Sequence, residues 1–304
     1  MGTRQRPLVV GVDLGGTEIK GILADEGGGT LAHEDRLIAP DAGTEAAVAA
    51  LQLTVAELVA ACPEDATVAG VGVAVPGLVD EERGVAVRSA RFGWRELPIA
   101  RLVAERVDAP VTLGHDVRLG AFAEQCAGAA VGCRDWLYVA VGTGVGAALV
   151  IGGHARGGAA GEIGHVVIDP VGEPCRCGGS GCLETVASGP AVAARYARRG
   201  GEPAVAASEI ARRAGDGEPL AAAVWGSAVE ALGAALAAAT ALVDLERIVV
   251  GGGVASAGEL LLNPLHAAMA ARLPLRVPPP LSTGALGSRA GCAGAAMLAR
   301  LRMS

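Results

Sequence analysis

The chain has 304 residues, of which 51% are hydrophobic and 19% are charged, and its formal net charge is −7. This composition is typical of a globular chain with a large core, and it excludes a disordered chain or a short disulfide scaffold. The negative charge argues against nucleic acid or an anionic membrane as the main partner. No uninterrupted apolar run approaches the roughly 20 residues of a membrane span. No secretory signal precedes the first strand, so we expect a cytoplasmic protein.

The first half of the chain opens with a predicted β-hairpin. Residues 8–14 are an apolar, β-branched run that ends in Gly15 and Gly16, and residues 18–25 continue with alternating polarity. The further elements expected before residue 118 are a helix over about 44–62, a buried strand and Pro-Gly turn within 68–80, a helix over 99–107 and a strand over 111–117.

The second half of the chain contains a second predicted β-hairpin that turns at glycines. The elements expected there are a helix over about 118–130, a strand pair over 136–153, an irregular segment rich in Cys and Gly, alanine-rich helices over 190–243, a strand over 247–254 and a terminal helix over 287–302. Both hairpins, near residues 8 and 136, turn at glycines. This similarity indicates an ancient internal duplication.

The turn of the first hairpin has the properties of a phosphate-binding loop. Gly15, Gly16 and Thr17 carry no bulky side chain, so their backbone amides can approach phosphate oxygens closely. Asp13 at the strand end is placed to hold a hydrated Mg²⁺, and Lys20, the only lysine in the chain, supplies positive charge nearby. An ordinary tight turn is the alternative interpretation.

Two further glycine turns favour a nucleotide over ordinary turns. Gly142, Thr143 and Gly144 follow the strand of the second hairpin, and Gly252 and Gly253 follow the strand near residue 250, where ribose or adenosine would lie. Three such turns at strand ends together predict nucleotide binding, although the pattern is neither a Walker A loop nor a GxGxxG motif.

A zinc motif is the most specific signal in the chain. His165, Cys175, Cys177 and Cys182 follow one another as H-x9-C-x-C-x4-C. One imidazole and three thiolates suit a tetrahedral zinc ion with no open position, so the predicted Zn²⁺ is structural. Free thiols in a glycine loop are the alternative.

Two glutamates flank this motif and are predicted to point at one ligand. Glu162 lies three residues before the histidine, and Glu184 lies just after the last cysteine. An ordered metal loop would direct both carboxylates to a single pocket, whereas a lone glutamate is normally a solvated surface charge.

Asp116 is the candidate catalytic base. It lies at the end of an apolar strand and just before a helix, where open α/β sheets place their active groups, and a carboxylate there can accept a proton from a hydroxyl. A helix N-cap occupies the same place, so spacing alone leaves both roles open.

These motifs, taken in chain order, resemble those of the ROK family (repressors, open reading frames, kinases). VDLGGTEIK, VPG at 75–77, His115-Asp116, VGTGVG, GEIGH, the CxCGxxGCLE segment and VGGGV all occur in the family's order, over nearly the whole chain. Within the family the chain most resembles the glucokinases of actinobacteria.

The resemblance implies an α/β, ribonuclease H-like (actin/hexokinase-type) two-domain fold with ATP in an interdomain cleft. We expect a small domain over 1–116, completed by a C-terminal helix at about 287–304, and a large domain over 117–286 that carries the zinc loop. The implied reaction is ATP-dependent phosphorylation of a hexose on its terminal hydroxyl. The implied assembly is a homo-oligomer, a homodimer or homotetramer.

Residue by residue, the resemblance assigns Asp116 as the catalytic base and Glu162, His165 and Glu184 as sugar-binding residues. One ring nitrogen of His165 would bind zinc while the other donates to a sugar oxygen. The residues matched to the phosphate turns are Asp13, Gly15, Gly16, Thr17, Gly142, Thr143 and Gly144, and those matched to the adenosine side are Gly252 and Gly253.

Two predicted sugar-facing positions depart from the family pattern. His115 and Arg91 stand where the family has asparagine, and this chain has only one asparagine in total. An imidazole changes the hydrogen-bonding pattern of the pocket, so mannose, N-acetylmannosamine or a sugar-like cyclitol are alternatives to glucose.

Two functions other than catalysis are alternatives on this scaffold. A sugar-sensing repressor on this scaffold carries an N-terminal DNA-binding module of roughly 60 to 80 residues, and the first predicted strand here starts at about residue 8. A sugar binder without catalysis would be favoured only if Asp116 were absent.

Overall fold

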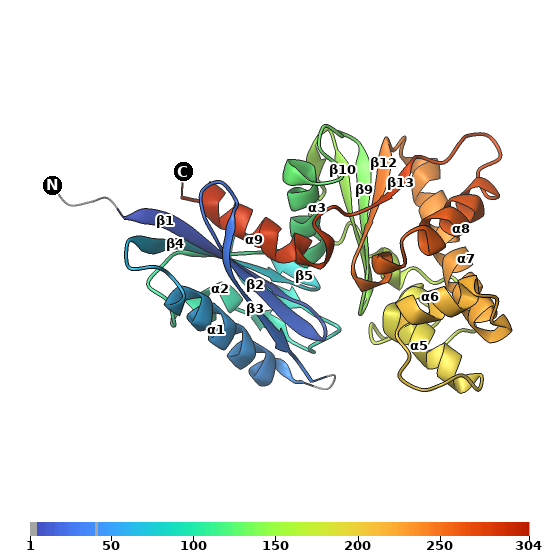
Figure 1. The fold of residues 1–304 in the computed structure, drawn as a ribbon, viewed down its shortest axis with the longest axis horizontal. Helices are drawn as coiled ribbons and strands as arrows, with labels where there is room; N and C mark the ends of the chain where they lie inside the picture. Colours follow the sequence, from blue (N-terminus) through green and yellow to red (C-terminus); the bar gives the residue numbers. More distant parts are fainter. Residues whose placement is uncertain (1–4, 40–41, 304) are drawn as a thin grey trace. The chain divides into compact units, whose positions relative to one another are not determined.

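The computed structural model describes residues 5–39 and 42–303. The chain divides into two compact units, Met1–Ala123 with Arg289–Ser304, and Glu124–Ser288 (Figure 1). The division falls within the helix that begins at Asp116, seven residues after the boundary expected from the sequence. The first eight residues of this helix therefore belong to the first unit.

A five-stranded sheet with the order β3-β2-β1-β4-β8 forms the centre of the first unit. Its strands are β1 (Arg6–Leu14), β2 (Glu18–Ala24), β3 (Thr30–Leu37), β4 (Ala66–Val75) and β8 (Val111–His115). The predicted hairpin is confirmed, since β1 and β2 pair antiparallel, with Leu14 opposite Ile19. β4 runs parallel to β1 and β8 runs parallel to β4, so these three strands end at one edge of the sheet.

Helices cover both faces of this sheet. They are α1 (Thr44–Ala60), α2 (Ile99–Ala104), α3 (Asp116–Ala127) and α9 (Ala290–Leu301). α1 and α2 pack their apolar side chains against β1 and β4 in one core cluster, whereas α9 packs on Val9 and Ile22 in another. α9 approaches the sheet closely because two strands carry glycine beneath it. A Cβ at Gly72 would lie 1.9 Å from the carbonyl oxygen of Ala295.

A small antiparallel sheet completes the first unit. Its strands are β5 (Leu78–Asp80), β6 (Val85–Arg88) and β7 (Arg95–Leu97). β3, β6 and β7 were not expected from the sequence. β3 is an edge strand with the polar sequence TLAHEDRL, and the other two have only four and three residues, too few to show a period.

The second unit repeats the sheet of the first. Its order, β11-β10-β9-β12-β13, matches the first sheet strand for strand, with an antiparallel hairpin followed by two parallel neighbours. Its strands are β9 (Trp136–Val141), β10 (Val145–Ile151), β11 (His154–Ala155), β12 (Arg247–Gly251) and β13 (Leu281–Thr283). The shared topology supports the duplication that the two hairpins indicated.

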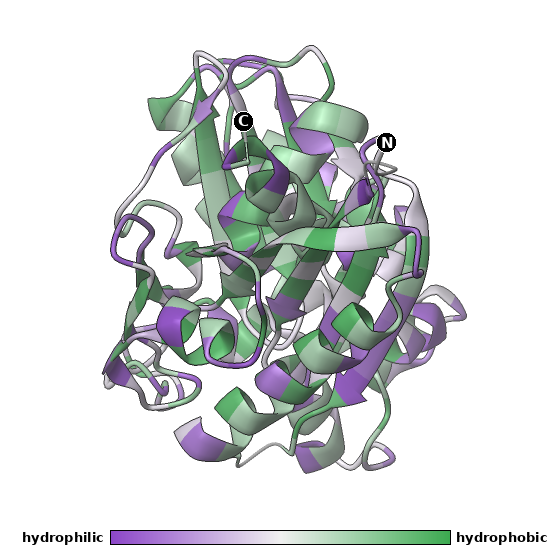
Figure 2. Cartoon of the chain, turned by 90° about the vertical axis from the view of Figure 1, so that its left-hand side faces the viewer, coloured by the Kyte–Doolittle hydropathy of each residue, from purple (hydrophilic) through white to green (hydrophobic). Residues whose placement is uncertain are grey.

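Helices and short 3-10 turns complete the second unit. The helices are α4 (Glu184–Ala187), α5 (Gly189–Arg198), α6 (Ala207–Gly215), α7 (Pro219–Leu242) and α8 (Glu259–Ala270), and the 3-10 turns are η1 (Ile163–His165), η2 (Gly253–Ala257) and η3 (Gly287–Arg289). Hydrophobic residues gather on the strands, and hydrophilic residues lie mainly in loops and on helix surfaces (Figure 2).

One helix, α7, is long and apolar enough by length and composition to cross a membrane. Its buried side chains, among them Val224, Trp225 and Leu232, belong instead to the main core cluster of the second unit. The helix is apolar because it packs against α4, α5, α6 and α8, as a core helix does.

Candidate functional site

The first glycine turn joins β1 to β2 and has an orphaned carboxylate beside it. The turn is closed by the Gly15 N–H, which donates to the Glu18 carbonyl at 3.0 Å. Asp13, near the end of β1, has a buried Oδ1 with no hydrogen-bond partner among the described residues. Burial, together with the nearby Asp116 carboxylate, raises the pKa of Asp13 to about 8, and Lys20 acts against this rise.

Lys20 lies directly opposite Asp13 in the hairpin register. Its Nζ is 3.0 Å from Glu18 Oε2, in an ion pair. The ammonium group therefore lies beside the glycine turn, and the Glu18 carboxylate on the same strand partly neutralises its charge.

The second and third glycine turns lie together in the second unit. A Cβ at Gly142 would lie 3.7 Å from the Gly253 backbone nitrogen, and Gly142 N–H donates to the Gly144 carbonyl at 2.9 Å. Gly252 has φ +81°, and a Cβ there would lie 2.4 Å from the Val141 carbonyl oxygen. Glycine is therefore required at this third turn by both conformation and space.

Glu184 connects the cysteine loop to the second turn. It is the first residue of α4, and its Oε2 accepts a hydrogen bond from the Val145 N–H at 3.0 Å. The same carboxylate lies 2.5 Å from where a Cβ at Gly144 would be. Thr143 lies between the two glycines, so the hydrogen bond from the Val145 N–H to Glu184 helps to hold the turn that contains it.

The four predicted zinc ligands are brought together. The candidate ligand atoms of His165, Cys175, Cys177 and Cys182 all lie within 4.8 Å of one another. His165 Nδ1 is 3.6 Å from Cys175 Sγ, and Cys177 Sγ is 3.7 Å from Cys182 Sγ. Burial raises the pKa of Cys182 to about 12, whereas the Gly179 backbone N–H lowers that of Cys177. A bound cation would stabilise the thiolate forms of all three cysteines.

The other ring nitrogen of His165 faces a carboxylate. Nε2 lies 3.8 Å from Glu162 Oε2, on the side of the ring away from the cysteines. The imidazole thus has one nitrogen at the cysteine cluster and the other beside Glu162, the arrangement that a shared metal and sugar ligand requires.

Asp116 and His115 lie where β8 ends and α3 begins. Asp116 Oδ1 accepts a hydrogen bond from the Val117 N–H at 2.7 Å, and it is 3.4 Å from His115 Nδ1. His115, which is 6% exposed, accepts the Arg118 N–H through Nδ1 at 3.3 Å. His115 therefore caps α3, a role that the sequence analysis had considered only for the aspartate.

Arg91 lies in the connection between β6 and β7, and its side chain reaches the first glycine turn. Its Nε donates to the Gly16 carbonyl at 2.8 Å, and a terminal guanidinium nitrogen donates to the same oxygen. That terminal nitrogen also lies 3.4 Å from the Ala39 carbonyl oxygen.

Glu124 was missed by the sequence analysis. It is fully buried, and its carboxylate accepts three backbone N–H groups, those of Ala129 at 2.7 Å, Ala285 at 3.0 Å and Leu286 at 2.8 Å. In the sequence it is one of several polar residues of α3, and no local pattern marks it as the buried one.

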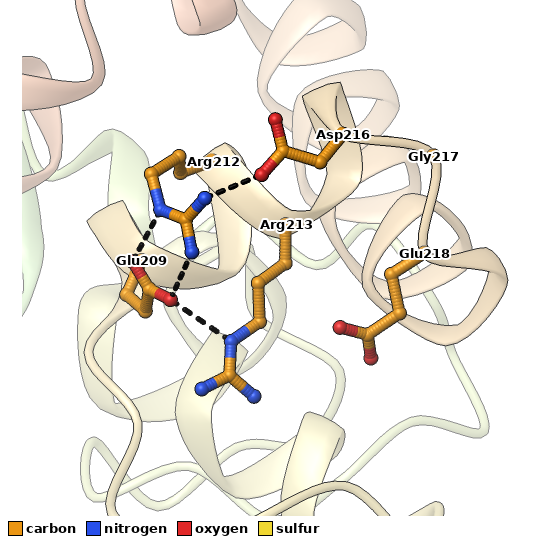
Figure 3. Close-up of a pocket in the computed structure, with 6 residues that line it drawn as sticks. All are labelled: Glu209, Arg212, Arg213, Asp216, Gly217 and Glu218. Carbon is orange, nitrogen blue, oxygen red and sulfur yellow. Dashed lines mark hydrogen bonds and ion pairs between the residues drawn. The ribbon is translucent and has the colours of Figure 1, made fainter.

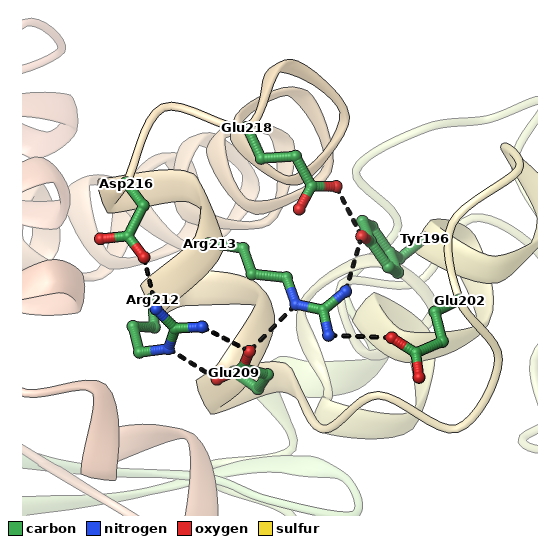
Figure 4. Close-up of polar contacts among 7 residues, drawn as sticks. All are labelled: Tyr196, Glu202, Glu209, Arg212, Arg213, Asp216 and Glu218. Atoms are coloured by element: carbon green, nitrogen blue, oxygen red, sulfur yellow. Dashed lines mark hydrogen bonds and ion pairs between the residues drawn. The ribbon is translucent and has the colours of Figure 1, made fainter.

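A surface pocket in the second unit is lined by none of these groups. It is lined by Glu209, Arg212, Arg213, Asp216, Gly217 and Glu218, around the C-terminal end of α6 (Figure 3). Its charges are paired with one another and with Tyr196 and Glu202 (Figure 4). We therefore interpret this cluster as a network of hydrogen bonds and ion pairs that links α5, α6 and α7.

Comparison with known proteins identifies the family. The model of the ROK family matches residues 9–302, so the chain belongs to this family. It is 31% identical to a glucokinase of Streptomyces coelicolor over 96% of this chain and 98% of that protein. It is 36% identical to a kanosamine kinase of Amycolatopsis mediterranei over 76% of this chain and 77% of that protein.

A solved structure confirms the predicted fold class. A ROK family glucokinase from Streptomyces griseus, crystallised with glucose and AMPPNP, superposes with a TM-score of 0.86 at 31% identity, over 97% of this chain and 99% of that one. The two-domain α/β fold of the actin and hexokinase type, expected from the motifs, is thereby confirmed.

Proposed function

We propose that this protein is an ATP-dependent hexose kinase that phosphorylates the terminal hydroxyl of its sugar. The observation that carries the proposal is the pairing of a glycine turn with two carboxylates in one unit. Asp13 beside the turn and Asp116 at the end of β8 lie close enough for the charge of one to raise the pKa of the other. The likeness to the glucose-bound and AMPPNP-bound glucokinase supports the same assignment.

Asp116 is the general base in this mechanism. Its carboxylate accepts the proton of the sugar hydroxyl as the hydroxyl oxygen forms a bond to the γ-phosphorus of ATP. The bond from that phosphorus to the β,γ-bridging oxygen breaks, and ADP leaves with the bond's electron pair. The Val117 N–H holds Oδ1 at 2.7 Å, which fixes the carboxylate at the start of α3. This orientation favours in-line attack by a bound sugar.

Backbone amides of the glycine turns bind phosphate oxygens, apart from those of Gly15 and Gly142, which close their own turns. Gly15, Gly16 and Thr17 form one turn, Gly142, Thr143 and Gly144 form the second, and Gly252 and Gly253 take the adenosine side. The Oδ1 of Asp13, which lacks a hydrogen-bond partner, suits a hydrated divalent cation. Mg²⁺ bound with ATP beside Asp13 would neutralise part of the phosphate charge.

Sugar recognition is assigned to Glu162, His165, Glu184 and His115. Carboxylates accept hydrogen bonds from sugar hydroxyls, and the ring nitrogen of His165 on the Glu162 side donates one. Because Glu184 also accepts the Val145 N–H, sugar binding and the second glycine turn share one carboxylate.

We propose further that His165, Cys175, Cys177 and Cys182 hold one structural Zn²⁺. The support is the close grouping of one imidazole and three thiols, the donor set of closed tetrahedral zinc sites. Elemental analysis of the purified protein should give about one zinc per chain. Cys177→Ser should lower the zinc content and raise KM for the sugar more than it lowers kcat. A folded, active preparation without zinc would refute this role.

The proposed function is tested with a panel of sugars, ATP and Mg²⁺. Glucose, mannose, N-acetylmannosamine, kanosamine and a cyclitol form the panel, the aminosugar because of the 36% identical kanosamine kinase. Asp116→Asn is the matched control, since an amide keeps the shape of the side chain but accepts no proton. We expect one sugar to be phosphorylated and Asp116→Asn to bind it without turnover. Sugar binding with no phosphorylation by the wild type would favour a non-catalytic sugar-binding regulator.

The setting of the protein is also part of the proposal. We place it in the cytoplasm as a homodimer or homotetramer, as its resemblance to the family implies. Light scattering during gel filtration measures the number of subunits.

A further inference from the structure

Arg91 is joined to the first glycine turn across a separation of 75 residues. Two of its guanidinium nitrogens donate to one acceptor, the carbonyl oxygen of Gly16. A guanidinium is always charged, and two donors directed at one oxygen fix that oxygen in both position and direction.

The loop that carries Arg91 holds the side chain in place. The guanidinium carbon lies 4.8 Å from the centroid of the Phe92 ring, in a cation–π contact. Phe92 is 5% exposed and stacks on Trp94 at 4.7 Å between ring centroids. The loop is closed by the Gly93 N–H, which donates to the Ser89 carbonyl at 2.9 Å. Arg91 is thus supported by a buried aromatic pair.

The direction of the Gly16 carbonyl determines the direction of an amide that the proposed function uses. A trans peptide is planar, so the Gly16 C=O and the Thr17 N–H point to opposite edges of one plane. Glycines at 15 and 16 leave this plane free to rotate unless something holds it. On the other side of Thr17, the Ile38 N–H donates to the Thr17 carbonyl at 2.8 Å. Arg91 and Ile38 therefore anchor the peptides on either side of Thr17.

We propose that Arg91 is a positioning residue for the phosphate turn and acts through the Gly16 carbonyl, in place of the sugar contact expected from the sequence. It sets the Thr17 amide in the orientation that binds a phosphate oxygen, and its charge adds attraction for the nucleotide. This inference rests on the proposed function of the turn, and it predicts that loss of Arg91 weakens nucleotide binding while sugar binding is retained.

The test compares Arg91→Ala and Arg91→Lys with Arg95→Ala, a matched loss of one charge at an exposed position of β7. Calorimetry gives Kd for AMPPNP with Mg²⁺ and, separately, Kd for the best sugar of the panel. We expect Arg91→Ala to weaken AMPPNP binding at least about tenfold, as for the loss of charge-assisted hydrogen bonds, and to leave the sugar Kd within about twofold. Arg91→Lys should recover part of the affinity, because an ammonium can reach the carbonyl but lacks the planar fork. Arg95→Ala should change neither constant.

Hydrogen exchange of the peptide over residues 14–19, measured without ligand, separates this inference from the proposed function. Faster exchange in Arg91→Ala than in the wild type supports the inference that Arg91 holds the turn in place. If the wild type binds no nucleotide, that result refutes the proposed function alone, and the exchange result still supports the role of Arg91. A weakened sugar Kd with unchanged AMPPNP binding would show that Arg91 contacts the sugar and overturn the inference. Unchanged exchange and unchanged AMPPNP binding would overturn it equally. If Arg91→Ala does not fold, the same comparisons are made with Arg91→Lys and Arg91→Gln.

Discussion

His115 and Asp116 are neighbours in the chain, and the structure separates their tasks. The backbone N–H of Arg118 is capped by the imidazole, and that of Val117 is bonded to the aspartate. Nδ1 of His115 thus takes part in capping α3. The sequence left two roles open for Asp116, catalytic base and helix cap. These roles are compatible, because His115 takes part in capping the helix.

We predict that His115→Asn retains kinase activity and changes the ranking among hexose epimers. The asparagine carboxamide can accept the same Arg118 N–H, so α3 keeps its cap, while the imidazole is replaced by a group of different shape and hydrogen-bonding pattern. Ratios of kcat/KM for glucose and mannose measure the effect, and His33→Asn on the polar edge strand β3 is the control. An unchanged ranking would limit His115 to the capping role.

Asp13 makes the stability of the ligand-free protein depend on pH. Its pKa is about 8 in the folded protein, well above that of an unfolded aspartate, so folding takes up a proton between about pH 4 and pH 8. The contribution of this group to the free energy of unfolding consequently falls as pH rises through that window, by up to about 1.4 kcal/mol per unit. Above about pH 8 it levels off.

We predict that Asp13→Asn removes this dependence, because an amide does not titrate. Urea unfolding between pH 5 and pH 8, without nucleotide or divalent cation, should give a smaller slope of stability against pH for the variant than for the wild type. The variant should be the more stable protein at pH 8. Parallel slopes would show that Asp13 is ionised in the folded protein at pH 5.

At the scale of single elements, the helices of the second unit share one apolar core, and a network of charged side chains adds further links between three of them. In α6 the Glu209 carboxylate accepts hydrogen bonds from Arg212 and Arg213, three and four residues further on (Figure 4). Arg213 in turn donates to the Tyr196 hydroxyl of α5 at 3.2 Å, and that hydroxyl donates to Glu218 at the start of α7. One short helix thus connects two others.

This network predicts acid sensitivity. Hydrogen bonds from Arg212 and Arg213 lower the pKa of Glu209 to about 2, so the stability that it contributes is fully present above about pH 5 and is lost as pH falls towards 2. Glu209→Gln should lower the melting temperature at pH 7 and reduce its further fall between pH 5 and pH 3. Glu230→Gln, which breaks a single exposed pair with Arg272, is the control and should have little effect. Equal acid sensitivity of wild type and Glu209→Gln would contradict the prediction.

At the scale of the whole molecule, the two units are two copies of one sheet topology joined by two chain crossings. The chain leaves the first unit between Ala123 and Glu124 and returns to it between Ser288 and Arg289. Glu124, at the first crossing, accepts the N–H groups of Ala285 and Leu286, just before the second. The two chain segments that cross between the units are therefore hydrogen-bonded to each other through one buried carboxylate.

We predict that Glu124→Gln destabilises the protein by about 2–4 kcal/mol, because the amide turns an N–H group towards backbone donors and removes a buried, charge-assisted acceptor. Gly128 and Gly284 crowd the carboxylate, with a Cβ at either lying within 2.7 Å of it, so the side chain has little room to turn away. Urea unfolding measures the loss, and Glu230→Gln serves again as the exposed control. A change below about 0.5 kcal/mol would mean that water or another acceptor takes over the three backbone N–H groups.

The sequence by itself determined the features that depend on neighbours in the chain. Glycines after an apolar strand predict the β1–β2 turn, and cysteine spacing predicts the cluster with His165, because each signal lies within one short segment. The contacts of Arg91 with Gly16, and of Glu124 with Leu286, join residues 75 and 162 positions apart, and no local pattern marks either pair. Only the tertiary structure decided these, since which carbonyl or amide a charged side chain meets depends on how strands and helices pack, and packing is set by the whole core.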